Sequence, residues 1–227
     1  GIVSEESSIN NSGTVVINGN GSAVYAGGGS LTNSGSITLN GDGYGLIAED
    51  GDLTNSGTVT LNGYGYAVLN DGGNLTNGGT ITVYGNGSVL NGQNGNVTNN
   101  EKGQLNIYTD GKASAYGIYL AGSTGNTITN KASIFINRYG AYAQAASTGN
   151  YGIWTDNAKI VNSGDISLGS STAGLSGIYG LYAAGSGSIE NSGVFFNDTA
   201  TTEIYTSKMV IFQYITYILK VNFQNNK

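Results

Sequence analysis

The sequence contains no cysteine, no proline and no histidine, and only 10% of its 227 residues are charged. Without cysteine the chain cannot form disulfides, thiolate-bound iron–sulfur clusters or thiolate zinc sites. Without histidine it lacks the commonest general base and metal ligand. With 8 basic and 14 acidic residues the net charge is −6, which argues against nucleic acids and anionic membranes as partners.

What the chain does contain is glycine, asparagine and regularly placed apolar residues. The 39 glycines are spread along the chain, which indicates a turn every few residues rather than one flexible linker. Disorder is the competing interpretation for such a composition. It is disfavoured because 38% of the residues are hydrophobic and β-branched residues recur at fixed spacing.

An internal repeat is the strongest signal in the sequence. Segments such as SLTNSGSITLNG and DLTNSGTVTLNG align without gaps, and their leading apolar residues are 22 positions apart in the first half. In the second half these leading residues lie further apart, at steps of 31, 32 and 29 positions. The leading residues are Ile9, Leu31, Leu53, Leu75, Val97, Ile128, Ile160 and Ile189.

Apolar and polar residues alternate inside each repeat, with the period of a β-strand. Leu53, Val59 and Leu61 share one parity, which predicts a half-buried strand, and a second strand of the form Tyr-Gly-apolar-x-Ala follows at 44–48 and its equivalents. Glycine-rich links supply the corners, because glycine reaches positive φ without steric cost. We therefore expect an all-β, right-handed parallel β-helix (β-solenoid), with about 22 residues per coil in the first half and longer coils later. Two inner columns are predicted: Leu31, Leu53, Leu75 and Val97, and beside them Ile37, Val59 and Ile81.

One polar column is as regular as the apolar ones. An asparagine stands two residues after each leading apolar residue, so its parity points it inward near a turn. We expect a structural ladder of side-chain amides that bond to one another and to the corner backbone, since buried amides need partners. Its members are Asn11, Asn33, Asn55, Asn77, Asn99, Asn130, Asn162 and Asn191.

A stripe of outward aromatic and aliphatic residues is predicted on the second strand. Such a face suits sugar rings and protein hot spots. The alternative is that loops or a neighbouring domain cover it. This candidate adhesive stripe consists of Tyr25, Ile47, Leu69, Tyr119, Tyr142, Trp154 and Tyr182.

Two rival functions depend on other residues. A pectinase-like carbohydrate-active enzyme would need paired carboxylates on one face. The one tight acidic group, Glu49, Asp50 and Asp52 with Asp71 nearly one coil later, fits a solvated corner better. We therefore predict no catalytic, cofactor-binding or metal site. A distant third function, ice binding, rests on two outward hydroxyl columns that resemble those of ice-binding solenoids. One column consists of Ser36, Thr58 and Thr80, and the other of Thr38, Thr60 and Thr82.

The repeat pattern stops after Gly193. The predicted solenoid domain spans 1–193, and 194–227 is a non-repeat tail. Its string FFNDTATTEIYT resembles a translated sequencing adapter, so we expect this tail to be an assembly artefact. The alternative is a genuine C-terminal cap.

The N-S-G-x-[IV]-x-[LI] unit, with Tyr-Gly-[LI]-x-Ala between copies, resembles the passenger region of Gram-negative autotransporters, the type V secretion adhesins, from Ile9 to Gly193. The resemblance implies a secreted, surface-displayed structural or adhesive segment, and because no catalytic constellation is present we do not expect this chain to be an enzyme. It also implies a leader and an outer-membrane β-barrel translocator in the full-length protein. The expected partner is a protein or glycan on a host or bacterial surface. The segment itself is not expected to insert in a membrane, because its longest apolar run, 210–219, is short.

Overall fold

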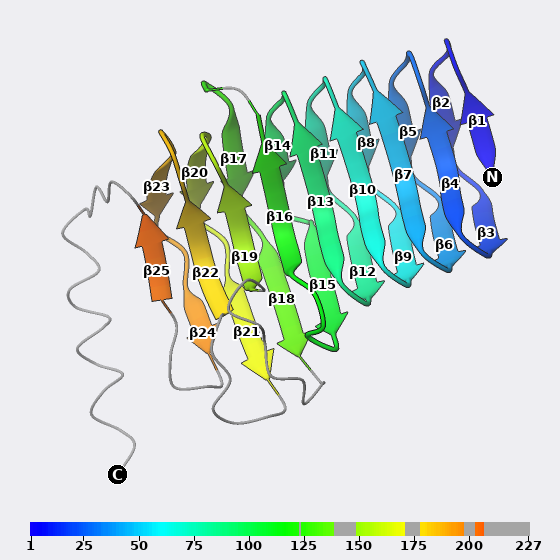
Figure 1. Cartoon of the computed structure of the whole chain (residues 1–227). Coiled ribbons are helices and arrows are strands. Elements are labelled where there is room, and N and C mark those ends of the chain that lie inside the picture. Colours follow the sequence, from blue (N-terminus) through cyan, green and yellow to red (C-terminus); the bar gives the residue numbers. More distant parts are fainter. Residues whose placement is uncertain (123, 139–148, 171–177, 198–202, 207–227) are drawn as a thin grey trace.

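The computed structural model describes residues 1–122, 124–138, 149–170, 178–197 and 203–206. These residues form 25 strands in three sheets. Each strand pairs with its neighbours in parallel. The described part contains no helix that is long and apolar enough to cross a membrane. The predicted all-β parallel β-helix is confirmed, and its coils advance in the right-handed sense (Figure 1).

Sheet A consists of the longest strands and has nine of them. In the seven strands between the first and the last, the pairing skips the third residue, so that two successive residues, such as Gly45 and Leu46, are both buried. This irregularity bends the sheet along one line. The strands are β1 (Ile2–Ser4), β4 (Gly21–Ala26), β7 (Gly43–Glu49), β10 (Gly65–Asp71), β13 (Gly87–Gln93), β16 (Ala115–Ala121), β19 (Asn150–Thr155), β22 (Ile178–Ala183) and β25 (Glu203–Thr206).

Sheet B consists of short strands in which an apolar residue and an asparagine point inward around one outward residue. Its eight strands are β2 (Ile9–Asn11), β5 (Leu31–Asn33), β8 (Leu53–Asn55), β11 (Leu75–Asn77), β14 (Val97–Asn99), β17 (Thr127–Asn130), β20 (Lys159–Asn162) and β23 (Ser188–Asn191).

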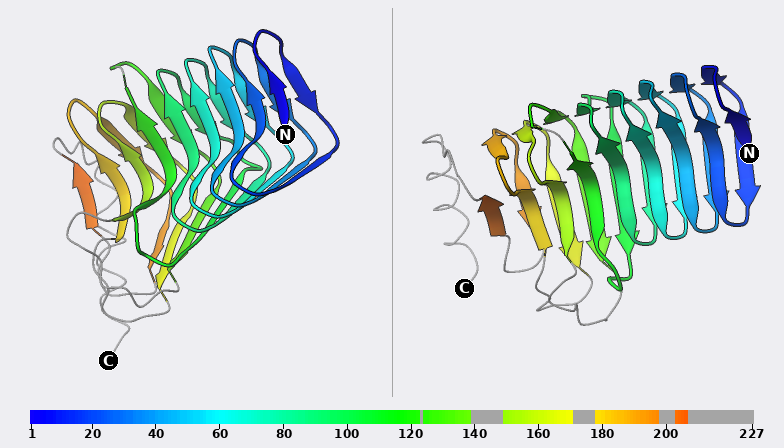
Figure 2. Two further views of the ribbon diagram at one scale, coloured as in Figure 1. Left: turned by 45° about the vertical axis from the view of Figure 1, so that its right-hand side comes forward. Right: turned by 45° about the horizontal axis from the view of Figure 1, so that its top comes forward.

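Sheet C follows sheet B in each coil and alternates buried and exposed residues. Figure 2 shows the three sheets running side by side along the stack. The strands of sheet C are β3 (Thr14–Asn18), β6 (Ser36–Asn40), β9 (Thr58–Asn62), β12 (Thr80–Tyr84), β15 (Gln104–Thr109), β18 (Ser133–Arg138), β21 (Ile166–Ser170) and β24 (Phe195–Asn197).

The core lies between the sheets and consists of apolar columns one residue wide. The 22-residue step is confirmed, because Leu53 pairs with Leu31 and with Leu75. These side chains are 0–1% exposed, so nearly all of their apolar surface is removed from water. Both predicted inner columns are present, and the second pairs Ile37, Val59 and Ile81 in register.

One detail of the predicted strands is wrong. The stretch from Leu53 to Leu61 forms two strands rather than one, since a corner at Ser56 and Gly57 separates β8 from β9. The backbone N–H groups of both corner residues donate to Asn33 O, at 2.8 and 3.2 Å. A side chain at Gly57 would collide with Gly35 O of the previous coil, so the corner requires glycine. The alternation of apolar and polar residues continues unchanged through the corner, so the sequence pattern does not reveal that a corner is present.

The extra residues of the later coils enter mainly where the chain passes from sheet C to sheet A. Between β12 and β13 this link is 85–86, whereas the corresponding later links are 110–114, 139–149 and 171–177. Insertions in solenoids map to loops in this way. The added residues therefore enter at one edge of sheet A.

The stack of strands extends into the segment 194–227. β24 pairs with β21, and β25 pairs with β22 with a shift of register. Phe195 is half-buried and packs against the core. Residues 207–227 lie outside the described residues, and the assignment of the tail as non-native stays a prediction.

Candidate binding surface

The eight predicted ladder asparagines form one column along the edge between sheets B and C. The Nδ2 of each donates to the Oδ1 of the next, at 2.7–2.9 Å. In seven of the eight residues the Nδ2 also donates to a carbonyl of its own corner, as in Asn77, which donates to Gly79 O at 3.0 Å. From Asn33 to Asn162 these side chains are 0–1% exposed. Their hydrogen bonds are used within the fold, so the geometry fits a structural role.

A second, exposed asparagine ladder runs along sheet C and was missed by the sequence reasoning. Asn40 Nδ2 donates to Asn18 Oδ1 at 2.8 Å, and Asn62 Nδ2 donates to Asn40 Oδ1 at 2.7 Å. Tyr84 and Tyr108 continue the column as stacked rings 5.0 Å apart. The signal was the asparagine that ends each Ile-Asn-Gly or Leu-Asn-Gly unit.

The predicted adhesive stripe maps onto one register column of sheet A, with two differences. Asn91, which the prediction omitted, pairs with both Leu69 and Tyr119 and so belongs to the column. Tyr142 lies outside the described residues, and Tyr119 pairs directly with Trp154. From β1 to β25 the column is Val3, Tyr25, Ile47, Leu69, Asn91, Tyr119, Trp154, Tyr182 and Tyr205.

A second outward column lies beside the stripe, on the other side of the bend in sheet A. Four of its tyrosines belong to Tyr-Gly units, a signal that was visible in the sequence but was used only to locate the strand. Its members are Ser22, Tyr44, Tyr66, Ser88, Tyr116, Tyr151 and Tyr179.

From β16 to β22 the two columns merge into an aromatic cluster of six half-buried rings. Along the stack the rings are nearly parallel: Tyr119 and Trp154 lie 4.6 Å apart at 3°, and Tyr151 lies 4.9 Å from Tyr179 at 14°. Across the bend they meet edge to face, as Tyr116 and Tyr119 do at 5.1 Å. The aromatic cluster consists of Tyr116, Tyr119, Tyr151, Trp154, Tyr179 and Tyr182.

This stacking determines what the cluster offers to a partner. The inner rings cover one another's faces, so the surface presents ring edges and phenol hydroxyls. Burial first, and then the neighbouring hydroxyls of Tyr116, Tyr179 and Tyr182, raise the pKa of Tyr151 to about 12. The phenol is therefore neutral at pH 7 and can both donate and accept hydrogen bonds.

The acidic residues of the rival enzyme hypothesis lie at the other edge of sheet A. Tyr25 Oη donates to Glu49 Oε2 at 2.8 Å, and this hydrogen bond raises the pKa of Tyr25. Asp52 Oδ1 accepts from the backbone N–H of Asn74 at 2.8 Å. Glu49 and Asp71 are register neighbours. Among the described residues, no group of three acidic side chains comes together as a metal site would need.

The hydroxyl columns of the ice-binding hypothesis are in register on sheet C, where Thr58 pairs with Thr80 and Thr60 with Thr82. Sheet B carries a further outward column that the sequence reasoning did not identify. Its consecutive members are Thr32, Thr54, Thr76, Thr98 and Thr129.

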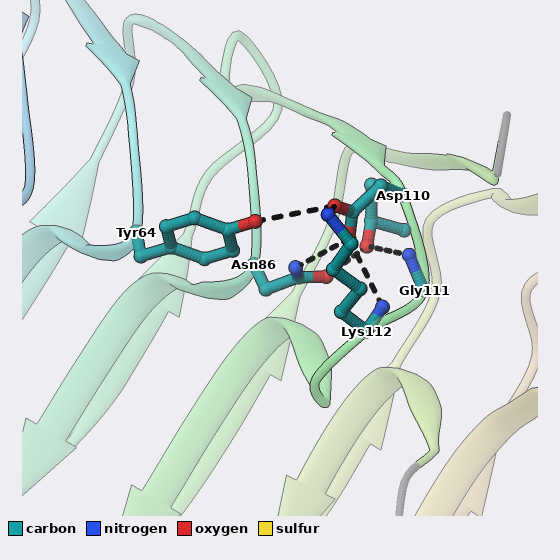
Figure 3. A network of polar contacts seen from close by, with 6 residues as sticks. Tyr64, Asn86, Asp110, Gly111 and Lys112 are labelled. Carbon is teal, nitrogen blue, oxygen red and sulfur yellow. Dashed lines mark hydrogen bonds and ion pairs between the residues drawn. The ribbon is translucent and has the colours of Figure 1, made fainter. Parts of the chain in front are cut away.

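A polar network ties three coils together where the coils begin to lengthen (Figure 3). Asp110 accepts hydrogen bonds from Asn86 Nδ2 at 2.7 Å and from Tyr64 Oη at 3.1 Å, and it forms an ion pair with Lys112 at 3.3 Å. Thr109 donates to Asn86 Oδ1. Burial alone would raise the pKa of Asp110, but these donors and the Lys112 backbone N–H together lower it. The network holds the first enlarged link, 110–114, against the preceding coils.

Comparison with known proteins adds no relative: no family model matches the chain, and no curated protein or solved structure is significantly similar to it.

Proposed function

We propose that this chain is a structural and adhesive segment of a surface-displayed bacterial protein, similar to an autotransporter passenger. The aromatic cluster would bind a protein or glycan on a host or neighbouring cell. The observation that carries the proposal is the clustering itself. Half-buried aromatic rings concentrate on one face of one half of a regular stack, where tyrosine and tryptophan favour recognition.

The scaffold supports this role through its chemistry. The buried apolar columns and the asparagine ladder stabilise the stack, so the outward residues can vary without disturbing it. A long rod that keeps its aromatic face fixed presents many binding atoms at little entropic cost, because tyrosine and tryptophan have few rotatable bonds. Secretion and surface localisation follow from the same proposal.

The test is binding of the labelled chain to epithelial cells and to bacterial cells, measured by flow cytometry. We expect the double variant Trp154→Ala/Tyr182→Ala to bind at least tenfold more weakly than the wild type. Tyr84→Ala is the matched control, because Tyr84 is an exposed stacked ring on sheet C. Circular dichroism would verify that each variant keeps its β structure. Unchanged binding by the double variant, or no binding by the wild type, would refute the proposal.

Ice binding is a second candidate, favoured by the threonine columns of sheets B and C. Coils about 4.8 Å apart repeat these hydroxyls at regular intervals along a sheet. Thermal hysteresis and ice recrystallisation would be measured, with Thr60→Tyr as the disrupting variant. A chain without either effect would eliminate this candidate and leave the adhesive proposal standing.

A further inference from the structure

Both outward columns of sheet A are interrupted at the same coil. On β13 the column positions hold Ser88 and Asn91. The coil before supplies Tyr66, and the coil after supplies Tyr116 and Tyr119. Two small polar residues therefore stand side by side, with Tyr66 and Leu69 on the coil before and Tyr116 and Tyr119 on the coil after. We call this place, between Tyr66 and Tyr116, the ring gap.

Along the stack, the spacing of the two flanking coils corresponds to one missing ring. Coils of a parallel stack are about 4.8 Å apart, so the rings on β10 and β16 are about 9.6 Å apart along the axis. Rings on successive coils of the same column lie at 5.1 Å for Tyr116 and Tyr151 and at 4.9 Å for Tyr151 and Tyr179. One six-membered ring placed midway would thus continue the stack at its own spacing. Tyr66, at the border of the gap, meets Tyr44 at 52°, whereas the cluster pairs stack at 7° and 14°.

At the base of the ring gap lies a side-chain amide oxygen that accepts no hydrogen bond within the fold. Asn91 is 2% exposed, and its Oδ1 has no hydrogen-bond partner. The ladder asparagines, by contrast, are bonded to one another. A buried carbonyl oxygen without a donor is rare because it has lost its water without compensation. This oxygen lies in the outward column between Leu69 and Tyr119, so a donor would have to reach it from the gap.

We propose that the ring gap is a binding subsite for a pyranose ring with equatorial substituents. Such a sugar has C–H groups on both faces, which suit contact with an aromatic ring on either side. Its hydroxyls lie around the edge, where one can donate to Asn91 Oδ1. The inference rests on the adhesive function proposed above and names the ligand class as a glycan.

The surrounding hydroxyls fit the same ligand. Burial first, and then the nearby groups Tyr116, Asp156 and Tyr66, raise the pKa of Tyr119, so its phenol stays neutral and can donate or accept. Ser88 is 1% and Asn91 2% exposed, so neighbouring side chains already occupy the ring gap and must rotate away to admit the sugar. Rotamer changes of partly exposed side chains are fast, so the covering does not prevent entry.

The experiment is a titration of the chain with cellotetraose, followed by the fluorescence of Trp154. This is the one tryptophan of the sequence, and it stacks on Tyr119 at 4.6 Å. We expect a saturable change in the wild type. Asn91→Leu should bind at least tenfold more weakly, because it removes the acceptor at similar size. Ser88→Tyr should abolish binding, because it fills the missing place in the stack.

The matched control is Ser22→Tyr, which introduces the same ring in the same column at β4 and should leave binding unchanged. Retained cellotetraose binding by folded Ser88→Tyr would overturn the inference. So would a wild type that adheres to cells through the aromatic cluster but binds neither cellotetraose nor N-acetylchitotetraose, and in that case the adhesive proposal survives. If indole saturates the signal and the saccharides do not, the gap takes a planar aromatic ring instead. A wild type that binds neither cells nor saccharides would refute both proposals.

Discussion

The coils before Val97 return every 22 positions, whereas those after it step by 31, 32 and 29 positions. Both halves nevertheless share the same interior, since Val97 pairs with Leu75 on one side and with Ile128 on the other. The asparagine ladder also crosses the boundary, from Asn99 to Asn130 at 2.8 Å. The change in coil length is therefore confined to the links and the surface.

The exteriors of the two halves differ. In the first half the outward columns of sheets B and C are largely threonine and serine, and one tilted tyrosine pair, Tyr44 and Tyr66, lies on sheet A. In the second half sheet A carries the aromatic cluster, and the enlarged links 110–114, 139–149 and 171–177 lead into it. A solenoid can separate stability from recognition in this way, because each coil needs only its inner columns to stack on its neighbours.

The largest expected effect tests whether the interior is equivalent in the two halves. Asn77→Leu and Asn162→Leu should each cost about 3 kcal/mol, since each leaves the next amide oxygen, Asn99 or Asn191, without its donor. Urea denaturation would measure both. The control is Asn62→Ala in the exposed ladder, expected to cost about 0.5 kcal/mol. A large effect in one half alone would show that the interiors are not equivalent.

The next effect compares tyrosines of the same column in different halves. Tyr151→Ala should destabilise the chain by about 2 kcal/mol, because its ring contacts Tyr116, Tyr179 and Tyr182. Tyr44→Ala, whose ring meets Tyr66 at 5.6 Å, should cost about 1 kcal/mol. Thermal unfolding followed by circular dichroism would rank them. Equal losses would mean that the cluster stabilises the chain no more than the single pair of Tyr44 and Tyr66 does.

A smaller effect concerns the network at the boundary between the halves. The folded pKa of Asp110 is lowered, so its contribution to stability is present above its ordinary pKa near 3.8 and is lost as the pH falls through the folded pKa. Asp110→Asn should cost about 1 kcal/mol at pH 7 and progressively less below pH 4. Urea midpoints at pH 7, 4 and 3 for both proteins would show this. A constant difference between them would contradict the assignment.

The last effect is absent at pH 7 and appears only in alkali. The pKa of Tyr151 is raised from 10.0 to about 12 in the folded chain, so folding favours the protonated phenol. The contribution of this group to the free energy of unfolding is therefore complete below pH 10 and is lost as the pH rises toward 12. Tyr151→Phe should match the wild type at pH 7 and be more stable than it at pH 11.5. The difference between their absorbance titrations at 295 nm should show one phenol ionising near pH 12, and a difference centred near pH 10 would disprove the shift.

Sequence periodicity predicted the elements that depend on repetition. The pairing of Leu31 with Leu53 and the inward position of Asn55 follow from a 22-residue step and from parity. The corner at Ser56 and Gly57 could not be predicted in the same way. It spans an even number of residues, so the apolar parity continues through it unchanged.

The binding surface was harder to predict because it joins residues from different coils. Tyr119 and Trp154 are 35 positions apart, and their pairing depends on how the intervening link is accommodated. Asn91 was omitted because it is polar, yet the register places it inside the stripe.

The sequence by itself determined the coil, its inner columns and the asparagine ladder, because these features repeat identical local chemistry at a constant step. Only the tertiary structure decided which rings meet face to face, which meet across the bend of sheet A, and where Ser88 and Asn91 interrupt them. The physical reason is that parallel stacking brings residues of successive coils about 4.8 Å apart, whatever their separation along the chain.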